Sequence, residues 1–351
     1  MHTPRHSTRK RLHRILVAGI GGASLGTELA KSLLLARRYR VFGCDISPLA
    51  YGHFQRGLEA TALVPRRGYA SAVLDLCRRW KIRAVIPGGE EPTLLLGRAK
   101  GTLEANGVAL AANSRALTLL CADKSQMSIR LRDLDVQIPR SLVISSDADF
   151  RSMQYPCVVK PAIGSGGSSF VFLAKDADEA AIYVNYLRQN GRKPVLQEYV
   201  PEDRGGEYSV GVLSLPNGHL VGSIALKRNL ESKLSVAIRN TSGVISSGYS
   251  QGQFAEFREV RAACEEIALR LMSKGPLNIQ GRLRDGRFLP FEINGRFSAS
   301  TYLRALAGVN EVDLFLGFLL EGRVPTMPRL RPGNALRSFS EVFVPDSRFR
   351  A

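Results

Sequence analysis

The sequence is poor in residues that build disulfide frameworks and transition-metal sites. Five cysteines are spread over 351 residues, are odd in number and never form a C-x-x-C pair, which argues against a disulfide framework or a zinc knuckle and favours a reducing cytoplasm. The five histidines show no arrangement with serine or cysteine that is typical of nucleophilic catalysis. We therefore expect chemistry that needs no side-chain nucleophile.

Long apolar runs are missing as well. The one candidate, residues 15–25, is interrupted by Gly19, Gly21 and Gly22, and no stretch reaches the roughly 18 apolar residues that a membrane span needs. The sequence therefore predicts a cytoplasmic protein without a membrane partner.

Positive charge is in excess, with 49 Lys and Arg against 31 Asp and Glu and a net charge of +18. Such an excess raises the question of a nucleic-acid partner. Apart from a basic tail at residues 1–14, however, the charges are scattered, and no aromatic-rich reading motif accompanies them. We expect no nucleic acid as partner.

The first part of the chain alternates between strand and helix patterns. Residues 15–22 predict a strand that breaks into a glycine turn, and apolar residues at helical spacing follow. A second strand ends on Asp45, and a helix near residues 70–80 precedes a strand that ends near Gly88. This alternation predicts a doubly wound parallel sheet over residues 15–122, in a protein of the α/β class.

The alternation stops after residue 122, and from Glu207 the pattern turns antiparallel. A buried strand ends in Lys160 just before a run of glycine and serine, residues 164–169, whose backbone N–H groups could fold over phosphates. It is not a P-loop, because the lysine precedes the glycines. We expect residues 239–253 to form an exposed flexible loop and residues 326–351 a poorly packed C-terminal tail.

The last hairpin carries the most informative polar residues. Glu292 and Asn294 are two apart on a strand and project from one face. A three-residue loop, residues 284–286, would put Gln280 diagonal to Glu292 on that face, whereas a two-residue loop would send it to the other side. Three oxygen donors suit Mg²⁺, or Mn²⁺ in its place, and Arg296 beside them suits phosphate.

These segments together resemble the ATP-grasp superfamily, in the branch around the large subunit of carbamoyl-phosphate synthase and the pyrrolysine-pathway ligase. The order and spacing of the matching segments hold from about residue 15 to about residue 320. The matching segments are Asp123-Lys124, residues 155–161 with the loop at 164–169, Gln197-Glu198-Tyr199-Val200, Glu207-Tyr208-Ser209-Val210 and residues 291–298.

The resemblance implies a fold and a set of binding residues. It implies a pre-ATP-grasp domain followed by two α+β lobes, residues 123–200 with the glycine loop and residues 201–325 with the metal site. This sequence departs from the usual family pattern at two positions. Gly295 stands where the family usually has proline, and Gln280 stands where many branches have an acid. The implied roles are phosphate contact for Lys124 and Lys160, a phosphate-covering loop for Gly164, Ser165, Gly166, Gly167 and Ser168, adenine contact for Glu198, Tyr199 and Val200, ribose contact for Glu207, a basic contact for Lys227 and Arg228, metal binding for Gln280, Glu292 and Asn294, and stabilisation of the transferred phosphoryl group for Arg296.

The resemblance also implies a reaction. A substrate carboxylate would attack ATP, and an amine would displace phosphate from the acyl phosphate to give an amide or peptide-like bond. The partners would be a small carboxylate and a small amine, with substrate contacts expected from Gly88, Gly89 and Glu90 at a strand end and from Arg239 in the loop. The sequence leaves the oligomeric state open, a homodimer included.

Other functions stay open at this stage. The acceptor could be a thiol or bicarbonate instead of an amine. The segment from Gly19 to Asp45 also fits a nicotinamide-dependent oxidoreductase, although its third glycine is late, at Gly26. The last alternative is a basic binding module whose nucleotide site is dead.

Overall fold

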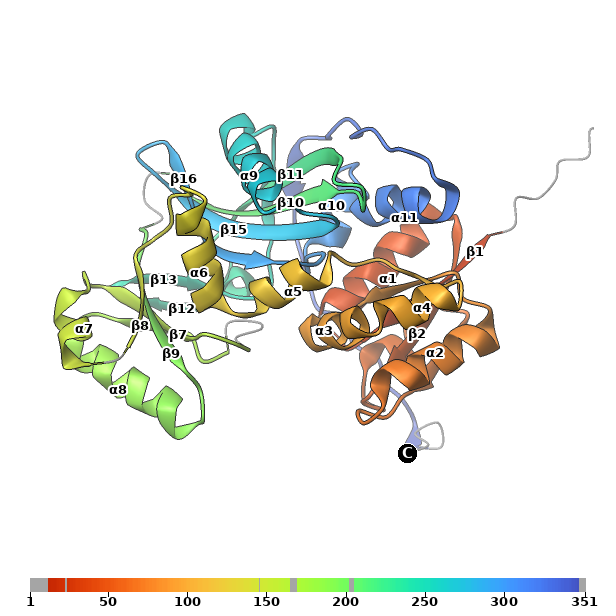
Figure 1. The fold of residues 1–351 in the computed structure, drawn as a ribbon, viewed down its shortest axis with the longest axis horizontal. Helices are drawn as coiled ribbons and strands as arrows, with labels where there is room; N and C mark the ends of the chain where they lie inside the picture. The colour runs from red at the N-terminus through yellow and green to blue at the C-terminus, as the bar shows by residue number, and fades with distance from the viewer. Residues whose placement is uncertain (1–11, 23, 145, 165–168, 202–204, 347–351) are drawn as a thin grey trace, which may run out of the picture.

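The computed structural model describes residues 12–346 apart from 23, 145, 165–168 and 202–204. Three bodies lie in a row: a parallel-sheet domain, a central six-stranded sheet and a smaller four-stranded sheet (Figure 1). No helix in these described ranges is long and apolar enough to cross a membrane. Ser165, Gly166, Gly167 and Ser168 of the expected phosphate-covering loop lie outside the described residues.

The N-terminal domain is built on a parallel five-stranded sheet of order β3-β2-β1-β4-β5. Ile15 and Val17 face one hydrophobic core with α1, whereas Leu16 and Ala18 face the other with α2. This strand is buried on both faces, which confirms the doubly wound parallel arrangement. The elements are β1 (His13–Ala18), α1 (Leu25–Ala36), β2 (Tyr39–Asp45), β3 (Ala60–Leu63), α2 (Tyr69–Trp80), β4 (Ala84–Pro87), α3 (Glu90–Arg98), α4 (Lys100–Ala105) and β5 (Ala109–Leu110).

Three glycines let the backbone pack closely where β1 turns into α1. A Cβ on Gly26 would lie 1.7 Å from the carbonyl oxygen of Gly19, and a Cβ on Gly88 would lie 1.8 Å from the same oxygen. Gly19 itself has φ of 101°, in the region that favours glycine. The glycines of this turn therefore hold β1, α1 and the end of β4 together.

The central sheet has the order β16-β15-β10-β11-β14-β17 and helices on both faces. Helices α5, α6 and α9 share one core with it, while α10 packs on the other face and α11 joins the core of α1. Its elements are α5 (Arg115–Ala122), α6 (Lys124–Asp133), β10 (Glu207–Ser214), β11 (Leu220–Arg228), β14 (Gly252–Phe254), α9 (Arg258–Arg270), β15 (Pro276–Arg284), β16 (Arg287–Asn294), α10 (Thr301–Leu306), α11 (Glu311–Glu321) and β17 (Gly333–Ala335).

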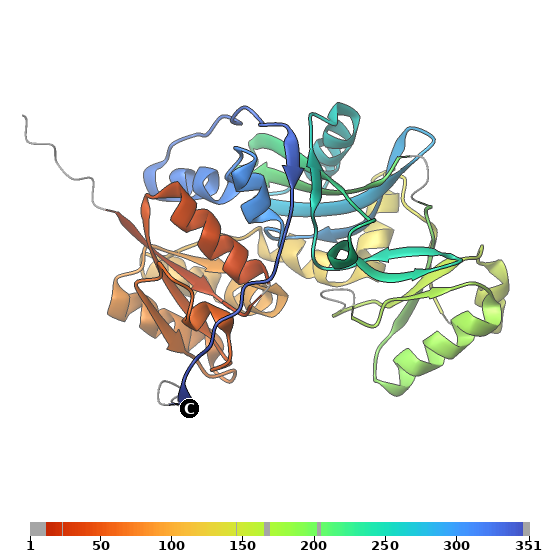
Figure 2. The same ribbon diagram turned by 180° about the vertical axis from the view of Figure 1, so that it is seen from behind.

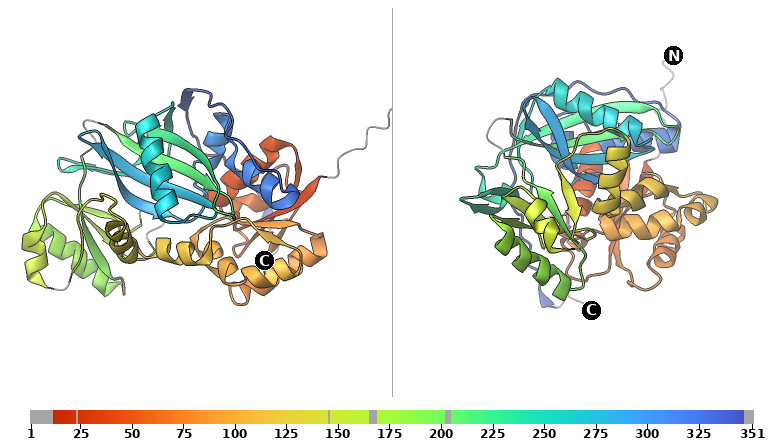
Figure 3. Two further views of the ribbon diagram at one scale, coloured as in Figure 1. Left: turned by 45° about the horizontal axis from the view of Figure 1, so that its top comes forward. Right: turned by 60° about the vertical axis from the view of Figure 1, so that its left-hand side comes forward.

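The smaller lobe is an antiparallel four-stranded sheet of order β6-β9-β7-β8, covered by two helices and touched by a separate hairpin. It stands at the far end from the N-terminal domain (Figure 3). Its elements are β6 (Ser141–Val143), α7 (Asp147–Ser152), β7 (Cys157–Pro161), β8 (Phe172–Ala174), α8 (Ala177–Gln189) and β9 (Pro194–Glu198), with the hairpin β12 (Val236–Asn240) and β13 (Gly243–Ser246) against β8.

Three segments differ from the sequence-based expectation. Residues 239–253, expected as a flexible loop, contribute to strands β12, β13 and β14. Helix α6, expected in the glycine-loop lobe, packs into the core of the central sheet through Met127 and Leu131. The expected tail forms β17, which pairs with β14, and then runs along the back of the N-terminal domain (Figure 2). Pairing between distant edge strands has no local signal in a sequence, which is why the pairing of β17 with β14 was missed.

We predict that Gly26→Ala destabilises the protein by about 3 kcal/mol or more, because the added methyl group would overlap the Gly19 carbonyl and the backbone would have to move. Gly97→Ala in α3 is the matched control, since a Cβ there meets no atom within 4 Å. It should stabilise by about 0.5–1 kcal/mol because alanine favours the helix. Urea unfolding measures both, and equal effects of the two substitutions would contradict the close packing.

Candidate functional site

A cavity of about 370 Å³ lies where the three bodies meet. This volume is in the range of small-molecule sites. In the N-terminal domain, its walls come from the segment that follows β4 and from the start of α1. The other walls come from β7, β9, the start of α6 and the central sheet. The charged residues that line it are Glu90, Lys124, Lys160, Glu198, Glu207, Arg228, Arg282, Glu292 and Arg296.

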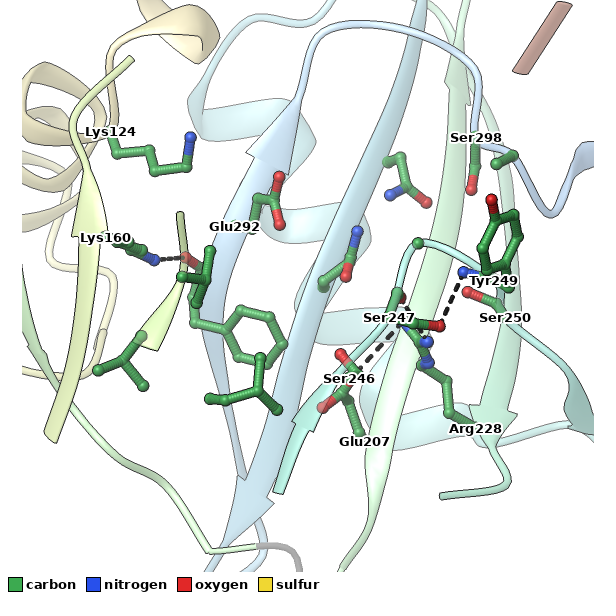
Figure 4. A pocket seen from close by; sticks show the side chains of 18 of the residues that line it. Lys124, Lys160, Glu207, Arg228, Ser246, Ser247, Tyr249, Ser250, Glu292 and Ser298 are labelled. Carbon is green, nitrogen blue, oxygen red and sulfur yellow. Dashed lines mark hydrogen bonds and ion pairs between the residues drawn. The ribbon is translucent and has the colours of Figure 1, made fainter. Parts of the chain in front are cut away.

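Lys160 connects the small lobe to the central sheet. Its ammonium group donates to Gln197 Oε1 at 2.7 Å, within the small sheet, and to the carbonyl oxygen of Phe291 at 3.1 Å, on β16 (Figure 4). Burial, reinforced by the charge of Lys124 and opposed by Glu292, lowers the pKa of Lys160 to about 7. Keeping Lys160 protonated in the free protein therefore costs free energy, and an anionic ligand would remove this cost.

Lys124 lies beside Lys160 because α6 begins there. Asp123 caps the helix by accepting from the backbone N–H groups of Ser125 at 2.9 Å and Gln126 at 3.2 Å. The backbone N–H of Lys124 donates to the carbonyl of Ala162 at 2.9 Å, just beyond β7. Two lysines thus converge at one end of the cavity (Figure 4).

The hairpin of β15 and β16 differs from the predicted three-residue loop. Arg284 pairs with Arg287, which leaves a two-residue loop of Asp285 and Gly286 with φ of 52° and 74°. Both angles are positive, as in the tight hairpin turn of type I′. The loop prediction was therefore wrong, and this loop alone would have turned Gln280 away from Glu292.

A β-bulge in β16 brings Gln280 and Glu292 back to the same face of the sheet. Gly281 pairs with Pro290 but Gln280 pairs with Glu292, so Phe291 is the extra residue. Gln280 consequently stands directly opposite Glu292, and both line the cavity. The carbonyl of the bulged Phe291 is also the one that accepts from Lys160.

Glu292 is surrounded by groups that favour its charged form. Burial alone would raise its pKa. The positive charges of Lys124, Lys160 and Arg296, with a hydrogen bond from Asn294, together lower the pKa below the usual range. Asn294 Nδ2 donates to Glu292 Oε1 at 3.3 Å, so these two predicted metal ligands are in contact. No group of three His, Cys, Asp or Glu side chains among the described residues could hold a metal ion. One carboxylate with two amides is a donor set that needs further oxygens from a ligand.

Arg296 follows the hairpin and lines the same cavity. Its Nη1 donates to the Phe297 carbonyl at 2.8 Å, and its buried Nε has no hydrogen-bond partner. Burial lowers its pKa, and the nearby charges of Glu292 and Glu90 oppose this. Gly295, where the resemblance expects proline, packs against α5, with a Cβ position 3.2 Å from Thr118 Cα.

The predicted hinge, residues 197–200, lines the cavity beside an apolar slot. Val158, Val171 and Ile245 line this part of the cavity, and their flat apolar surfaces suit an aromatic ring. The side chain of Glu198 is engaged elsewhere: it pairs with Arg284 and accepts from the Arg140 backbone N–H at 3.0 Å. The backbone N–H of Glu198 is engaged as well, because it donates to the Arg140 carbonyl at 2.8 Å.

Glu207 is held between two buried arginines. Its Oε2 accepts from Arg282 Nε at 3.0 Å, while its Oε1 lies 3.5 Å from Arg228 Nη1 and has no hydrogen-bond partner. Arg228 Nη2 donates to the Ser247 carbonyl at 2.8 Å, which fixes a loop of the cavity wall (Figure 4). Arg228 Nε has no partner either. Three buried atoms around the cavity, on Glu207, Arg228 and Arg296, are thus ready for a polar ligand.

Four of the predicted residues that the structure describes do not line the central cavity. Gly164 is not in its walls, and Asn294 borders the small adjoining cleft with Glu90 and Arg296 instead. Lys227 does not line the described cavity, whereas the next residue on the strand, Arg228, does, because neighbours on a strand face opposite sides. Arg239 lies on β12, donates to the Leu230 carbonyl and borders a separate surface groove. Its expected substrate contact has no support from this position. Gly88, Gly89 and Glu90 do line the central cavity.

The glycine turn of the N-terminal domain is covered. Asp45 accepts from the backbone N–H groups of Ile20 at 2.7 Å and Ser47 at 2.9 Å, so its carboxylate braces the turn. The short helix η1 (Tyr51–His53) sits against the turn, with the Gly52 N–H donating to the Ile20 carbonyl at 2.9 Å. A ribose would have to displace these contacts, which argues against the oxidoreductase.

The C-terminal segment holds two loops of the cavity wall in place, which the sequence did not indicate. Arg337 forms an ion pair with Glu28 of α1 at 3.1 Å and donates to the carbonyls of Ala299 at 2.8 Å and Ser250 at 3.4 Å. Ser250 and Ala299 line the cavity. One buried arginine therefore joins the N-terminal domain to two loops of the central body.

We predict that Arg337→Ala lowers the free energy of unfolding by about 3 kcal/mol, because it leaves the buried Glu28 with only Lys31 as a partner. Arg331→Ala is the matched control in the same segment, since Arg331 is exposed and its Nη2 makes one hydrogen bond, to the Leu306 carbonyl. It should cost no more than about 0.5 kcal/mol. Urea unfolding compares them, and an Arg337 effect as small as the control would show that the segment is dispensable.

Comparison with known proteins agrees with this geometry. The family model of the ATP-grasp domain matches residues 121–300, about half of the chain. A similar sequence is the large chain of carbamoyl phosphate synthase from Sulfolobus acidocaldarius, 23% identical over 258 residues, which are 71% of this chain and 23% of that one. This chain thus spans less than a quarter of the length of that relative.

Similar solved structures share the fold. The biotin carboxylase domain of 2-oxoglutarate carboxylase from Hydrogenobacter thermophilus aligns with a TM-score of 0.67 and 13% identity over 92% of this chain and 73% of that one. D-alanine–D-alanine ligase from Bacillus anthracis aligns with a TM-score of 0.60 and 16% identity over 89% of this chain and 98% of that one.

The family match and the cavity coincide. Every charged residue that lines the cavity, except Glu90, falls inside the matched segment of residues 121–300. The prediction of an ATP-grasp enzyme is confirmed at the level of the family: this chain belongs to the ATP-grasp family.

Proposed function

We propose that this chain is an ATP-dependent ligase that joins a carboxylate to an amine through an acyl phosphate and releases ADP and phosphate. The observation that carries the proposal is the convergence of Lys160, Glu292 and Arg296 on one cavity. A cation that bridges two lobes, a buried carboxylate and a second cation are what transfer of a phosphoryl group requires.

The cavity fits a nucleoside triphosphate from end to end. The apolar slot beside the hinge suits adenine. Oε1 of Glu207, which lies 3.5 Å from Arg228 Nη1 but accepts no hydrogen bond, would accept from a ribose hydroxyl. Lys124 and Lys160 would contact the phosphates, which would also restore the ordinary pKa of Lys160.

Glu292, Gln280 and Asn294 would hold Mg²⁺. The ion would supply charge neutralisation for the phosphates, which in turn would supply the oxygens that this donor set lacks. Because Gln280 adds no charge, we expect the ion to bind weakly without nucleotide.

The two chemical steps balance. A carboxylate oxygen attacks the γ-phosphorus, the bond to the β,γ-bridging oxygen breaks, and ADP leaves with that electron pair. The amine nitrogen then attacks the acyl carbon, a C–N bond forms, and the C–O bond to phosphate breaks. An amine that arrives as an ammonium ion loses two protons in total. Arg296 would stabilise the charge on the phosphoryl group.

The relatives support this reaction class without fixing the acceptor. D-alanine–D-alanine ligase is by name an amide-forming enzyme, whereas the biotin carboxylase structure contains bicarbonate. Thiol and bicarbonate acceptors therefore remain alternatives that the test below has to separate.

We predict that MgATP raises the melting temperature of the protein, that NADH does not, and that Glu292→Ala abolishes the shift because the ion loses its only carboxylate. Glu104→Gln on α4 is the control, since Glu104 is exposed and does not line the cavity. The same protein, given MgATP, hydroxylamine and pools of carboxylic acids, should form a hydroxamate, which reports the acyl phosphate. Stabilisation by NADH alone, or ATP cleavage that no carboxylate stimulates, would contradict the proposal.

We predict that nucleotide affinity falls as the pH rises above about 7. The pKa of Lys160 in the free protein is about 7, so above that pH the amine is mostly neutral and a proton must be taken up when phosphates bind. Calorimetry of MgADP binding in two buffers of different ionisation enthalpy measures this uptake, which should approach one proton per nucleotide at about pH 8.5. Lys160→Met should abolish the uptake, and equal uptake in this variant would contradict the assignment.

A further inference from the structure

Four carboxylates line the cavity, and three of them are already engaged. Glu198 pairs with Arg284, Glu207 pairs with Arg282 and Arg228, and Glu292 accepts from Asn294 beside two lysines. The fourth, Glu90, has no hydrogen bond or ion pair with any other described residue. Its carboxylate is therefore the one in this cavity that no described residue already engages.

Comparison with Glu91 shows that the position of Glu90 in the helix does not by itself explain why its side chain faces the cavity. Glu90 and Glu91 both stand in the first turn of α3, where the helix dipole favours either of them. Glu91 turns outward and forms an ion pair with Arg66 at 2.8 Å, with both side chains more than half exposed. Glu90 faces the cavity and also borders the small adjoining cleft formed with Asn294 and Arg296.

Glu90 and Arg296 carry opposite charges but do not form an ion pair with each other. Each acts on the other electrostatically, yet they make no ion pair within 4.0 Å, and both line the same two hollows. A ligand that places a positive group at Glu90 and a negative group at Arg296 would match both charges.

We propose that Glu90 binds the ammonium group of the second substrate, so that this enzyme takes a cationic amine, such as an amino acid, and neither a thiolate nor bicarbonate. The inference rests on the proposed function, in which Arg296 stabilises the phosphoryl group. The amine then enters from the side of the N-terminal domain, past the short wall of Gly88 and Gly89, and meets the acyl phosphate next to Arg296. Both anionic acceptors would be repelled by the Glu90 carboxylate.

Competition between two nucleophiles tests this assignment. The protein receives MgATP and the carboxylic acid that gives the most hydroxamate, with hydroxylamine, which is largely uncharged at neutral pH, and a mixture of the twenty amino acids and ethylamine. The measured quantity is the ratio of amide to hydroxamate. Glu90→Gln should lower this ratio about tenfold or more, the loss expected when one charge-assisted hydrogen bond is removed.

Two further variants make the result decisive. Glu91→Gln should keep the wild-type ratio, and Glu90→Asp, which keeps the charge, should retain more of the amide than Glu90→Gln. A wild-type ratio in Glu90→Gln, or product formed with bicarbonate or a thiol in place of amide, overturns the role of Glu90 while the acyl phosphate stands. Absence of hydroxamate from the wild type overturns the proposed function and this inference with it.

Discussion

The contact of the Lys160 ammonium group with the Phe291 carbonyl fixes the relation between the two lobes. The lysine comes from the small sheet, and the carbonyl is available because Phe291 is the extra residue of a β-bulge in the central sheet. The same bulge brings Gln280 opposite Glu292. One irregularity in one hairpin therefore sets the position of the buried cation, of the carboxylate and of the amide beside it. Burial makes this arrangement costly without a ligand, because two lysines and an arginine share a small volume.

The N-terminal domain contributes walls rather than a nucleotide site. Its glycines serve the close approach of three backbone segments, and Asp45 braces the turn that they form. What this domain gives to the cavity is the end of β4, with Gly88, Gly89 and Glu90, and the start of α1. The C-terminal segment then joins α1 to two loops of the central body through Arg337. Segments from both ends of the chain therefore hold the cavity wall in place.

Local patterns predicted much of this architecture. The parallel sheet followed from alternating strands and helices. The face shared by Gln280 and Glu292 was also predicted, but through a loop that the structure replaces with a two-residue turn and a bulge. Arg337 and strand β17 depend on pairing between distant segments, which hydrophobic periodicity does not report. Whether a strand residue faces the cavity or the opposite side, as for Arg228 and Lys227, likewise depends on register.

The central claim is that one cavity holds both the phosphates and the ion. The most direct measurement is a crystal structure of the complete chain with Mg²⁺ and a non-hydrolysable ATP analogue. The account predicts adenine beside residues 197–200, the ion on Glu292 with Gln280 and Asn294, and the terminal phosphate between Lys160 and Arg296. A nucleotide bound at the Gly19 turn, or an ion held without Glu292, would contradict it.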